Sequence, residues 1–598
     1  MTIARSLTPI CALALTFAPL LLHAQSADTS HLQPVVVSAT KGDNPGALTQ
    51  AVTVITGADL RARGVTRVTD ALREVPGAAL VQSGSFGSLT SLFLRGGESR
   101  STKVLIDGVP VNAPGGYFDL SHLTTDNIDR IEVVRGPASV LYGADAVSGI
   151  VQIFTRNAGV GVRHDASLRA GTYGTREGDA SVAAGDSNLG VTLGGGWHAT
   201  DGIVPFNNQY SNGTLSSSLR ASSATFGEAA LSARYTTADY HYPQDFQALP
   251  SDSNAHRVQH RFTVGVNGSR RLSPGAEARL ILASNDVRDI TEDVAVPFGG
   301  KAPSHSLSSS HGVRHSAEGR ISYDLPLVAT VTGGAEYMTE RERSGSRAGA
   351  VGAATSPTGG FSADRHNVAY YTELLGKASD VLSYNVSGRI DDNSEYGKIN
   401  TYRLGGSVPF AAGIRLRASL ATAFNAPAFN QIRATAFTVA SPNLQPERSR
   451  SWEIGVERVW AEDRIRVAGD YFNQRFFQLI QYVDGGPPAY LGSYANLTGA
   501  SANGYEGEAE LRPIPAVRLT GSFTVVAPKV TATSPGSTAT QKPGDALIRR
   551  ATHSGSIGAT YVASPVQNFG IAAVYVGKRP DVDFAQFPSP TLTLPSYV

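Results

Sequence analysis

Few residues in this sequence have the types and spacing that a catalysed reaction needs. Asp391 and Asp392 form the one carboxylate pair that resembles the acid and base of a glycoside hydrolase. Neighbouring residues of a strand face opposite sides of its sheet, so this pair would not act on one substrate. We therefore expect no enzyme, and a secreted carbohydrate-active enzyme stays a remote alternative.

Metal and phosphate sites have equally little support. His311 and His315 are four residues apart, but they stand in a Ser/Gly-rich stretch that we expect to be a loop. The segment "GPASVLYG" (136–143) is not a phosphate-binding loop, because no Lys-Ser/Thr follows its second glycine. We expect no metal and no cofactor.

The elements around these residues are more informative than the residues themselves. Residues 131–155, "IEVVRGPASVLYGADAVSGIVQIFT", predict a strand, a tight turn, one or two helical turns, a glycine turn and a strand. Residues 68–80 predict a short amphipathic helix closed by Pro76-Gly77. Residues 89–112 predict two extended segments around a polar turn. The sequence thus places a small α+β domain, without catalytic chemistry, near its N-terminus.

The chain begins with the pattern of a secretory signal. Arg5 precedes an apolar run from Ile10 to Leu22, and we expect cleavage after Ala24. The run is shorter than the roughly 20 residues of a spanning helix. The single cysteine, Cys11, lies inside the signal, which excludes disulfides and thiolate metal sites from the mature chain.

Composition favours a secreted or membrane β protein. With 63 glycines, 22 tyrosines and 2 methionines among 598 residues, the chain is unlike a set of Leu-rich helical domains. Its net charge of +1 gives no reason to expect nucleic acid.

Beyond Gly159 the sequence alternates between apolar and polar residues. In "YEGEAEL" (505–511), Tyr505 and Leu511 share one face with a glycine and an alanine, and three glutamates occupy the other. Segments of about 9 to 11 residues recur over roughly 440 residues, which favours a large transmembrane barrel with its apolar face toward lipid. A string of soluble β domains is the alternative.

These segments together resemble TonB-dependent outer-membrane receptors. The stretch 68–155 is similar to the plug domain of that family, and "QPVVVSA" (33–39) is similar to the TonB box that precedes such a plug. In the barrel, "TAFNAPAFNQI" (422–432), "SPNLQPERSRSWEIGVE" (441–457) and "GRIDDNSEYG" (388–397) match the same family. The short plug and the last of these segments look most like the corrinoid (vitamin B12) receptors.

The resemblance implies a domain order and an all-β-dominated fold. We expect a signal peptide at 1–24, a flexible segment with the TonB box at 25–44, an α+β plug at 45–157 and an antiparallel transmembrane barrel at 158–598, with about 22 strands when complete. Because such barrels have an even strand number and a closing strand that ends on an aromatic residue, the end at "LPSYV" predicts that two to four strands are missing. A gap would then separate the strand near Val598 from the first strand, near 163–171. A barrel that closes with fewer strands is the alternative.

The resemblance also implies three groups of site residues. The expected TonB box comprises Gln33, Pro34, Val35, Val36, Val37, Ser38 and Ala39. The expected ligand contacts at the plug apex are Leu89, Ser91, Glu98, Gly116 and Tyr117. The expected polar network between plug and barrel comprises Arg95, Asp107, Glu132, Arg135, Asp145 and Arg156.

The function implied is TonB-dependent uptake of a scarce, large ligand across the outer membrane by a monomer. A corrinoid is expected, with a ferric siderophore as the alternative and a passive porin as a remote one. Corrinoid receptors also carry calcium-binding acidic clusters in early extracellular loops, but "DGIVPFNNQYSNG" (201–213) lacks the repeated carboxylates, so calcium is not supported. The partners implied are a periplasmic TonB-type energy-transducing protein, which would pair with the box as an added strand, and outer-membrane lipid.

Overall fold

The computed structural model describes residues 39–41, 49–243, 254–295, 304–325, 329–378, 381–483, 485, 491–533, 542–564, 567–583 and 590–598. All of them belong to one compact unit, Val35–Val598. The expected signal peptide and residues 33–38 of the expected TonB box lie outside the described residues. Within the described ranges, no helix has the length and apolar character needed to cross a bilayer.

The N-terminal domain, here called the plug, is a five-stranded sheet with short helices. The sheet order is β1-β6-β7-β4-β5, in which only the β4–β7 pair is parallel. Its elements are β1 (Val52–Thr56), α1 (Gly57–Ala62), α2 (Val68–Leu72), β2 (Ala78–Gln82), β3 (Thr90–Leu94), η2 (Ser99–Ser101), β4 (Thr102–Ile106), β5 (Val109–Pro110), η3 (Leu120–His122), β6 (Ile128–Arg135), α3 (Ser139–Tyr142) and β7 (Gly149–Thr155).

The expected strand, helical turn and strand of 131–155 are therefore β6, α3 and β7. Their two strands are antiparallel neighbours. The expected helix at 68–80 is shorter, because α2 ends at Leu72 and the chain re-enters a strand at Ala78. Buried aliphatic side chains from the sheet, α2 and the β2–β3 hairpin form one core, which includes the fully buried Leu72, Leu94, Ile131 and Val151.

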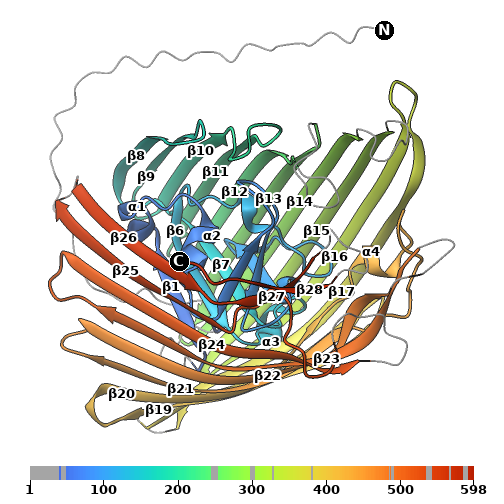
Figure 1. Cartoon of the computed structure of the whole chain (residues 1–598). Helices are drawn as coiled ribbons and strands as arrows, with labels where there is room; N and C mark the ends of the chain where they lie inside the picture. The colour runs from blue at the N-terminus through green and yellow to red at the C-terminus, as the bar shows by residue number, and fades with distance from the viewer. Residues whose placement is uncertain are drawn as a thin grey trace. The chain divides into compact units, whose positions relative to one another are not determined.

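The rest of the chain forms an antiparallel barrel around the plug (Figure 1). Within the described residues its ring holds nineteen strands, β8 to β26, against about 22 expected for a complete barrel. The strands are β8 (Gly161–Ala170), β9 (Arg176–Gly185), β10 (Leu189–Thr200), β11 (Tyr210–Ser223), β12 (Gly227–His241), β13 (His256–Ser273), β14 (Ala276–Ala295), β15 (Ser304–Leu325), β16 (Ala329–Ala350), β17 (Ser356–Ala378), β18 (Leu382–Asn393), β19 (Gly397–Phe410), β20 (Ile414–Asn425), β21 (Glu447–Trp460), β22 (Ile465–Val483), β23 (Ser493–Leu511), β24 (Val517–Thr533), β25 (His553–Ser564) and β26 (Gln567–Val576). The large barrel with an N-terminal plug is thus confirmed.

The strand order closes on itself, with β26 next to β8. Among the described strands, however, β26 has a register only with β25, and β8 has one only with β9, so the expected gap in the wall stays a prediction. An open edge would leave backbone donors and acceptors unpaired in lipid. Near Val598, β28 (Thr591–Leu594) pairs with β27 (Arg579–Val582) in a separate two-stranded sheet, and Tyr597 forms an isolated antiparallel bridge with Val576 at the end of β26.

The two ends of the barrel differ in their connections. At one end, here called the short-turn end, strands are joined by a few residues, as at 274–275 and 461–464. At the other, the long-loop end, the connection 426–446 carries the helix α4 (Phe429–Ile432). In outer-membrane barrels short turns are periplasmic and long loops extracellular.

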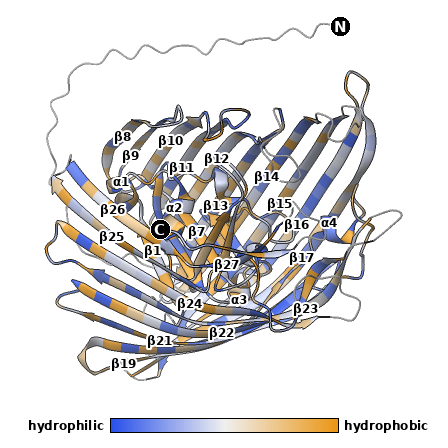
Figure 2. Cartoon of the chain, in the orientation of Figure 1, coloured by the Kyte–Doolittle hydropathy of each residue, from blue (hydrophilic) through white to orange (hydrophobic). Residues whose placement is uncertain are grey.

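Alternation along each strand separates a polar inner face from an apolar outer one (Figure 2). In β23, Tyr505 faces outward and is 57% exposed, whereas its neighbour Glu506 faces the plug and is 2% exposed. This is the division expected for residues 505–511. Inward-facing carboxylates are therefore available to bind the plug.

Candidate functional site

The described chain enters the barrel at the short-turn end through a buried segment, Ala39 to Lys41. The Lys41 backbone N–H donates to Glu373 Oε2 at 2.8 Å, and its Nζ donates to Glu318 Oε2 at 2.9 Å. Lys41 Nζ also lies 4.8 Å from the centre of the Tyr142 ring. Burial lowers the pKa of the Lys41 ammonium, although Glu318 opposes that shift. Ala39, the last residue of the expected TonB box, is 3% exposed.

This segment yields a prediction about its own mobility. Because Lys41 ties the segment to β15, Lys41→Ala should raise the rate at which maleimide modifies a cysteine introduced as Ala39→Cys, by about tenfold or more (~1.4 kcal/mol per tenfold). Lys377→Ala removes an exposed lysine at the same end of the barrel and should leave the rate unchanged. Equal rates in all three backgrounds would show that Lys41 does not restrain the segment.

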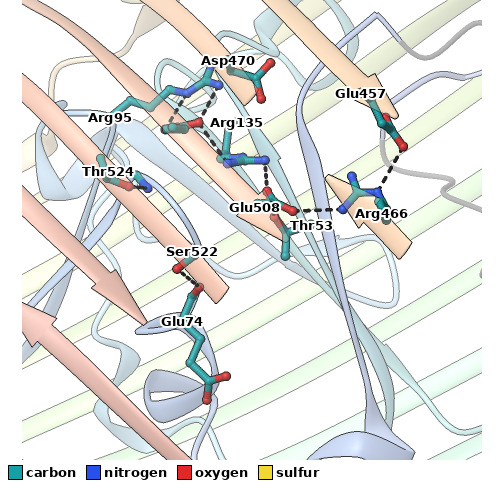
Figure 3. A network of polar contacts seen from close by, with 12 residues as sticks. Thr53, Glu74, Arg95, Arg135, Glu457, Arg466, Asp470, Glu508, Ser522 and Thr524 are labelled. Atoms are coloured by element: carbon teal, nitrogen blue, oxygen red, sulfur yellow. Dashed lines mark hydrogen bonds and ion pairs between the residues drawn. The ribbon is translucent and has the colours of Figure 1, made fainter. Parts of the chain in front are cut away.

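A buried group of ion pairs fastens the plug to β21 and β23 (Figure 3). Arg95 donates through Nε and Nη2 to the two carboxylate oxygens of Glu506, at 3.0 and 2.9 Å, and through Nη1 to Glu453 at 2.5 Å. Arg135 donates through Nη1 to Glu506 at 2.9 Å, and it also pairs with Glu508. We call these five residues the Arg95–Arg135 cluster.

The local fold explains why the two arginines reach the wall. Arg95 ends the β2–β3 hairpin with a φ of +49°, a left-handed conformation that redirects the chain at the turn into Gly96. Arg135 is the last residue of β6. Both are 1% exposed. Burial alone would lower the pKa of the Arg95 guanidinium, yet Glu506 and Glu453 outweigh it and raise that pKa, so the cation is held firmly in its charged form.

The other expected network residues divide into two groups. Asp145 accepts from Arg314 of β15 at 3.2 Å, and Arg156 donates to Asp165 of β8 at 2.6 Å, so both reach the barrel. Asp107 accepts from the Thr155 backbone at 2.8 Å, and Glu132 accepts from Arg130 at 2.8 Å, so these contacts stay inside the plug. Sequence motifs do not indicate the glutamates on the barrel side of the cluster, Glu453, Glu506 and Glu508; their position on the inward face of alternating strands is the signal that could have found them.

The expected ligand contacts lie in plug loops that face the long-loop end, except for Ser91, which lies in β3. Leu89 and Ser91 are half-buried, and Tyr117 is 37% exposed. Gly116 is buried instead, with a φ of +89°, and a Cβ there would lie 2.2 Å from the Arg100 carbonyl oxygen. Gly116 therefore shapes the loop that presents Tyr117.

Glu98 is held by a barrel residue. Its Oε1 accepts from Arg550 Nη2 at 2.9 Å, and Arg550 also donates to the Gly97 carbonyl at 3.0 Å. Burial would raise the pKa of the Glu98 carboxyl, but the Arg550 guanidinium outweighs it and lowers that pKa. The carboxylate therefore stays ionised, and its side chain keeps 38% of its surface exposed.

Barrel side chains that sequence reasoning missed border the same end. Arg100 of the plug donates to Gln431 of α4 at 3.0 Å and pairs with Glu447 of β21. Arg257 of β13 donates to Asp289 of β14 at 2.7 Å. The plug apex is thus bounded by charged groups from both sides of the barrel.

The carboxylate pair Asp391 and Asp392 lies in β18, and the histidine pair His311 and His315 lies in β15. Asp391 faces inward, where it accepts from Arg389 at 2.9 Å, whereas Asp392 faces outward with 56% of its side chain exposed. His311 and His315 lie in β15 rather than in the expected loop, because their Ser/Gly-rich stretch still alternates and pairs with β14 and β16. Among the described residues, no three His, Cys, Asp or Glu side chains are grouped to hold a metal.

Comparison with known proteins agrees with this architecture. Residues 155–598 match the family model "TonB dependent receptor-like, beta-barrel", and residues 45–150 match "TonB-dependent Receptor Plug Domain". The chain is 28% identical to the vitamin B12 transporter BtuB of Vibrio vulnificus (strain YJ016), over 94% of this chain and 86% of that protein.

Solved structures show the same fold. The siderophore receptor PirA from Acinetobacter baumannii superposes with a TM-score of 0.70 at 17% identity, covering 92% of this chain and 91% of that one. The pyoverdine receptor FpvA from Pseudomonas aeruginosa PAO1 gives 0.75 at 14% identity, covering 94% and 89%. With a barrel around a plug and a family match over most of its length, the chain belongs to the TonB-dependent receptors.

Proposed function

We propose that this receptor imports a corrinoid across the outer membrane. One observation carries the proposal: the 28% identity to a vitamin B12 transporter extends over 94% of the chain, plug and barrel alike. The siderophore receptors share 14 to 17% identity, a level that speaks for the fold rather than for the ligand. A ferric siderophore is therefore the second candidate.

The general transport function follows from the family. The protein is an outer-membrane β-barrel of a family that transports large ligands with the help of TonB. The proposal adds no chemical step, since the ligand would leave the receptor as it entered.

The exposed plug loops suit a large amphipathic ligand. Tyr117 offers an aromatic ring, and Leu89 and Ser91 add apolar and hydroxyl surface. Glu98, kept ionised by Arg550, would accept hydrogen bonds from ligand amides, and the rim of a corrin ring carries several such amides.

We further propose that residues 33–39 act as the TonB box. An extended segment with the backbone donors of Val35 to Ala39 can pair as an added strand with a periplasmic partner. Its last residue, Ala39, lies at the short-turn end of the barrel, beside Lys41 and its partners in β15 and β17. We expect the receptor to do this as a monomer.

Tyr117→Ala tests the ligand site. If the ring packs on cobalamin, its loss should weaken binding by about 1 to 3 kcal/mol, which is roughly 5- to 150-fold in Kd. Calorimetric titration of the purified receptor with cobalamin measures this. Tyr173→Ala removes a more exposed tyrosine, 54% against 37% for Tyr117, from the β8–β9 turn and should leave the Kd unchanged. Undetectable cobalamin binding alongside tight binding of a ferric siderophore would replace the corrinoid by the second candidate.

A further inference from the structure

A row of cationic side chains crosses the barrel wall near the long-loop end. In the strand register, Thr422 of β20 lies opposite Arg450 of β21, and Arg450 lies opposite Arg475 of β22. Arg475 in turn lies opposite Ser501 of β23, which lies opposite Lys529 of β24. We call Arg450, Arg475 and Lys529 the cationic row.

The cationic row faces away from the plug. All three side chains are exposed, whereas the residues flanking Arg450 and Arg475 along their strands are buried on the inner face. Since successive side chains of a strand point to opposite sides, the row lies on the outer surface of the barrel.

No carboxylate of the wall balances these charges. On the described strands β20 to β24 every Asp and Glu is on the inner face, and within the described residues neither Arg450, Arg475 nor Lys529 forms an ion pair. Side chains directly opposite on antiparallel strands have Cβ atoms about 4.5–5.5 Å apart, and like charges in such pairs are destabilising. Arg450 and Arg475 are such a pair.

The opposite wall shows a different arrangement. There the outward Arg288 of β14 has its own carboxylate, with Nε 3.4 Å from Asp286 Oδ1. Within the part of the chain that the structure describes, the cationic row therefore stands out as a surface without its own counter-charge.

The side chains beside the cationic row indicate its depth in the membrane. Immediately toward the short-turn end lies an outward aromatic ladder, with ring centroids 5.3 Å apart for Trp452 and Tyr471 and 4.9 Å apart for Tyr471 and Tyr505. Beyond it the wall is apolar and exposed, as at Ile454 and Phe523. Aromatic girdles mark the membrane interface, so the row lies at headgroup level on the extracellular side.

We propose that the outer face of β20 to β24 binds a lipid whose headgroup carries phosphate. A phosphate between Arg450 and Arg475 would accept two-pronged hydrogen bonds from both guanidinium groups and remove their mutual repulsion. The hydroxyl of Ser501 and the ammonium of Lys529 extend the row toward a second phosphate. The aromatic and apolar wall below would take the acyl chains, which is why a lipid fits this surface better than a free anion.

The experiment uses the full receptor in neutral detergent, with synthetic bisphosphorylated lipid A as the probe. The lipid should raise the thermal midpoint of the wild type and stay bound in native mass spectrometry. The double variant Arg450→Gln/Arg475→Gln should bind it at least tenfold more weakly. Without lipid the same variant should melt at or above the wild-type midpoint, because the like-charge pair is gone; a purely structural role for the arginines would lower it.

Arg458→Gln is the matched control, since Arg458 faces outward on the same strand near the short-turn end. It should bind the lipid as the wild type does, and lipid A without phosphates should have no effect on any form. An equal lipid-induced shift in the double variant would overturn the proposal. So would a full shift with inorganic phosphate alone, which would indicate an anion site that needs no lipid.

Discussion

A receptor carrying Val36→Pro should bind its ligand with wild-type affinity and import none of it. Proline removes the backbone donor at the centre of the expected TonB box and fixes φ near −65°, so the segment can no longer pair as an added strand. The plug sheet begins only at Val52, so the plug and barrel should fold normally. Ligand titration of the purified protein and uptake by whole cells separate the two effects.

Val36→Thr is the control for this variant. Threonine keeps the backbone donor and the β-branched shape, so uptake should persist. Normal uptake by the proline variant would rule out strand pairing at residues 33–39, and loss of ligand binding in the same variant would mean that the segment supports the plug instead.

Glu506→Ala should produce the largest loss of plug stability. The substitution leaves Arg95 and Arg135 buried at 1% exposure without the carboxylate they share. Removing one partner of a buried ion pair typically costs about 3–5 kcal/mol, because an uncompensated charge remains. We expect the free energy of plug unfolding to fall by about that amount, as measured by urea titration with a fluorophore on the plug.

Glu462→Ala provides the comparison. Glu462 lies in the β21–β22 turn with 88% of its side chain exposed, 3.6 Å from Arg464. An exposed pair of this kind is worth about 0–1 kcal/mol, so the plug should be nearly unaffected. If both variants lost the same small amount, the Arg95–Arg135 cluster would not be what holds the plug.

Much of the architecture could be predicted because it depends on patterns between residues that are close in the sequence. Alternation in 505–511 is enough to place Glu506 and Glu508 on the inner face, since side-chain direction along a strand has a period of two. Family motifs then supplied the barrel and the plug. The position of Asp391 opposite in direction to Asp392 followed from the same rule.

The contacts within the site could not be predicted in this way. Arg95 and Glu506 are 411 residues apart, and Arg135 and Glu506 are 371 apart. Their meeting depends on how the plug is seated in the barrel, which no local pattern encodes. Likewise, Arg450 and Arg475 become neighbours only through the register of β21 on β22.

The carboxylates of the Arg95–Arg135 cluster affect how fast the plug rebinds to the barrel wall after it has moved away. The wall around the cluster carries five carboxylates, Glu453, Glu457, Asp470, Glu506 and Glu508, against three guanidinium groups, those of Arg415, Arg417 and Arg466. Arg95 and Arg135 of the plug supply the two missing positive charges. A plug drawn away from this wall leaves these ion-paired wall residues with two excess negative charges. Reseating is then an encounter between opposite charges, faster than a neutral docking would be, and it slows as ionic strength shortens the range of that attraction to about 10 Å at 0.1 M salt.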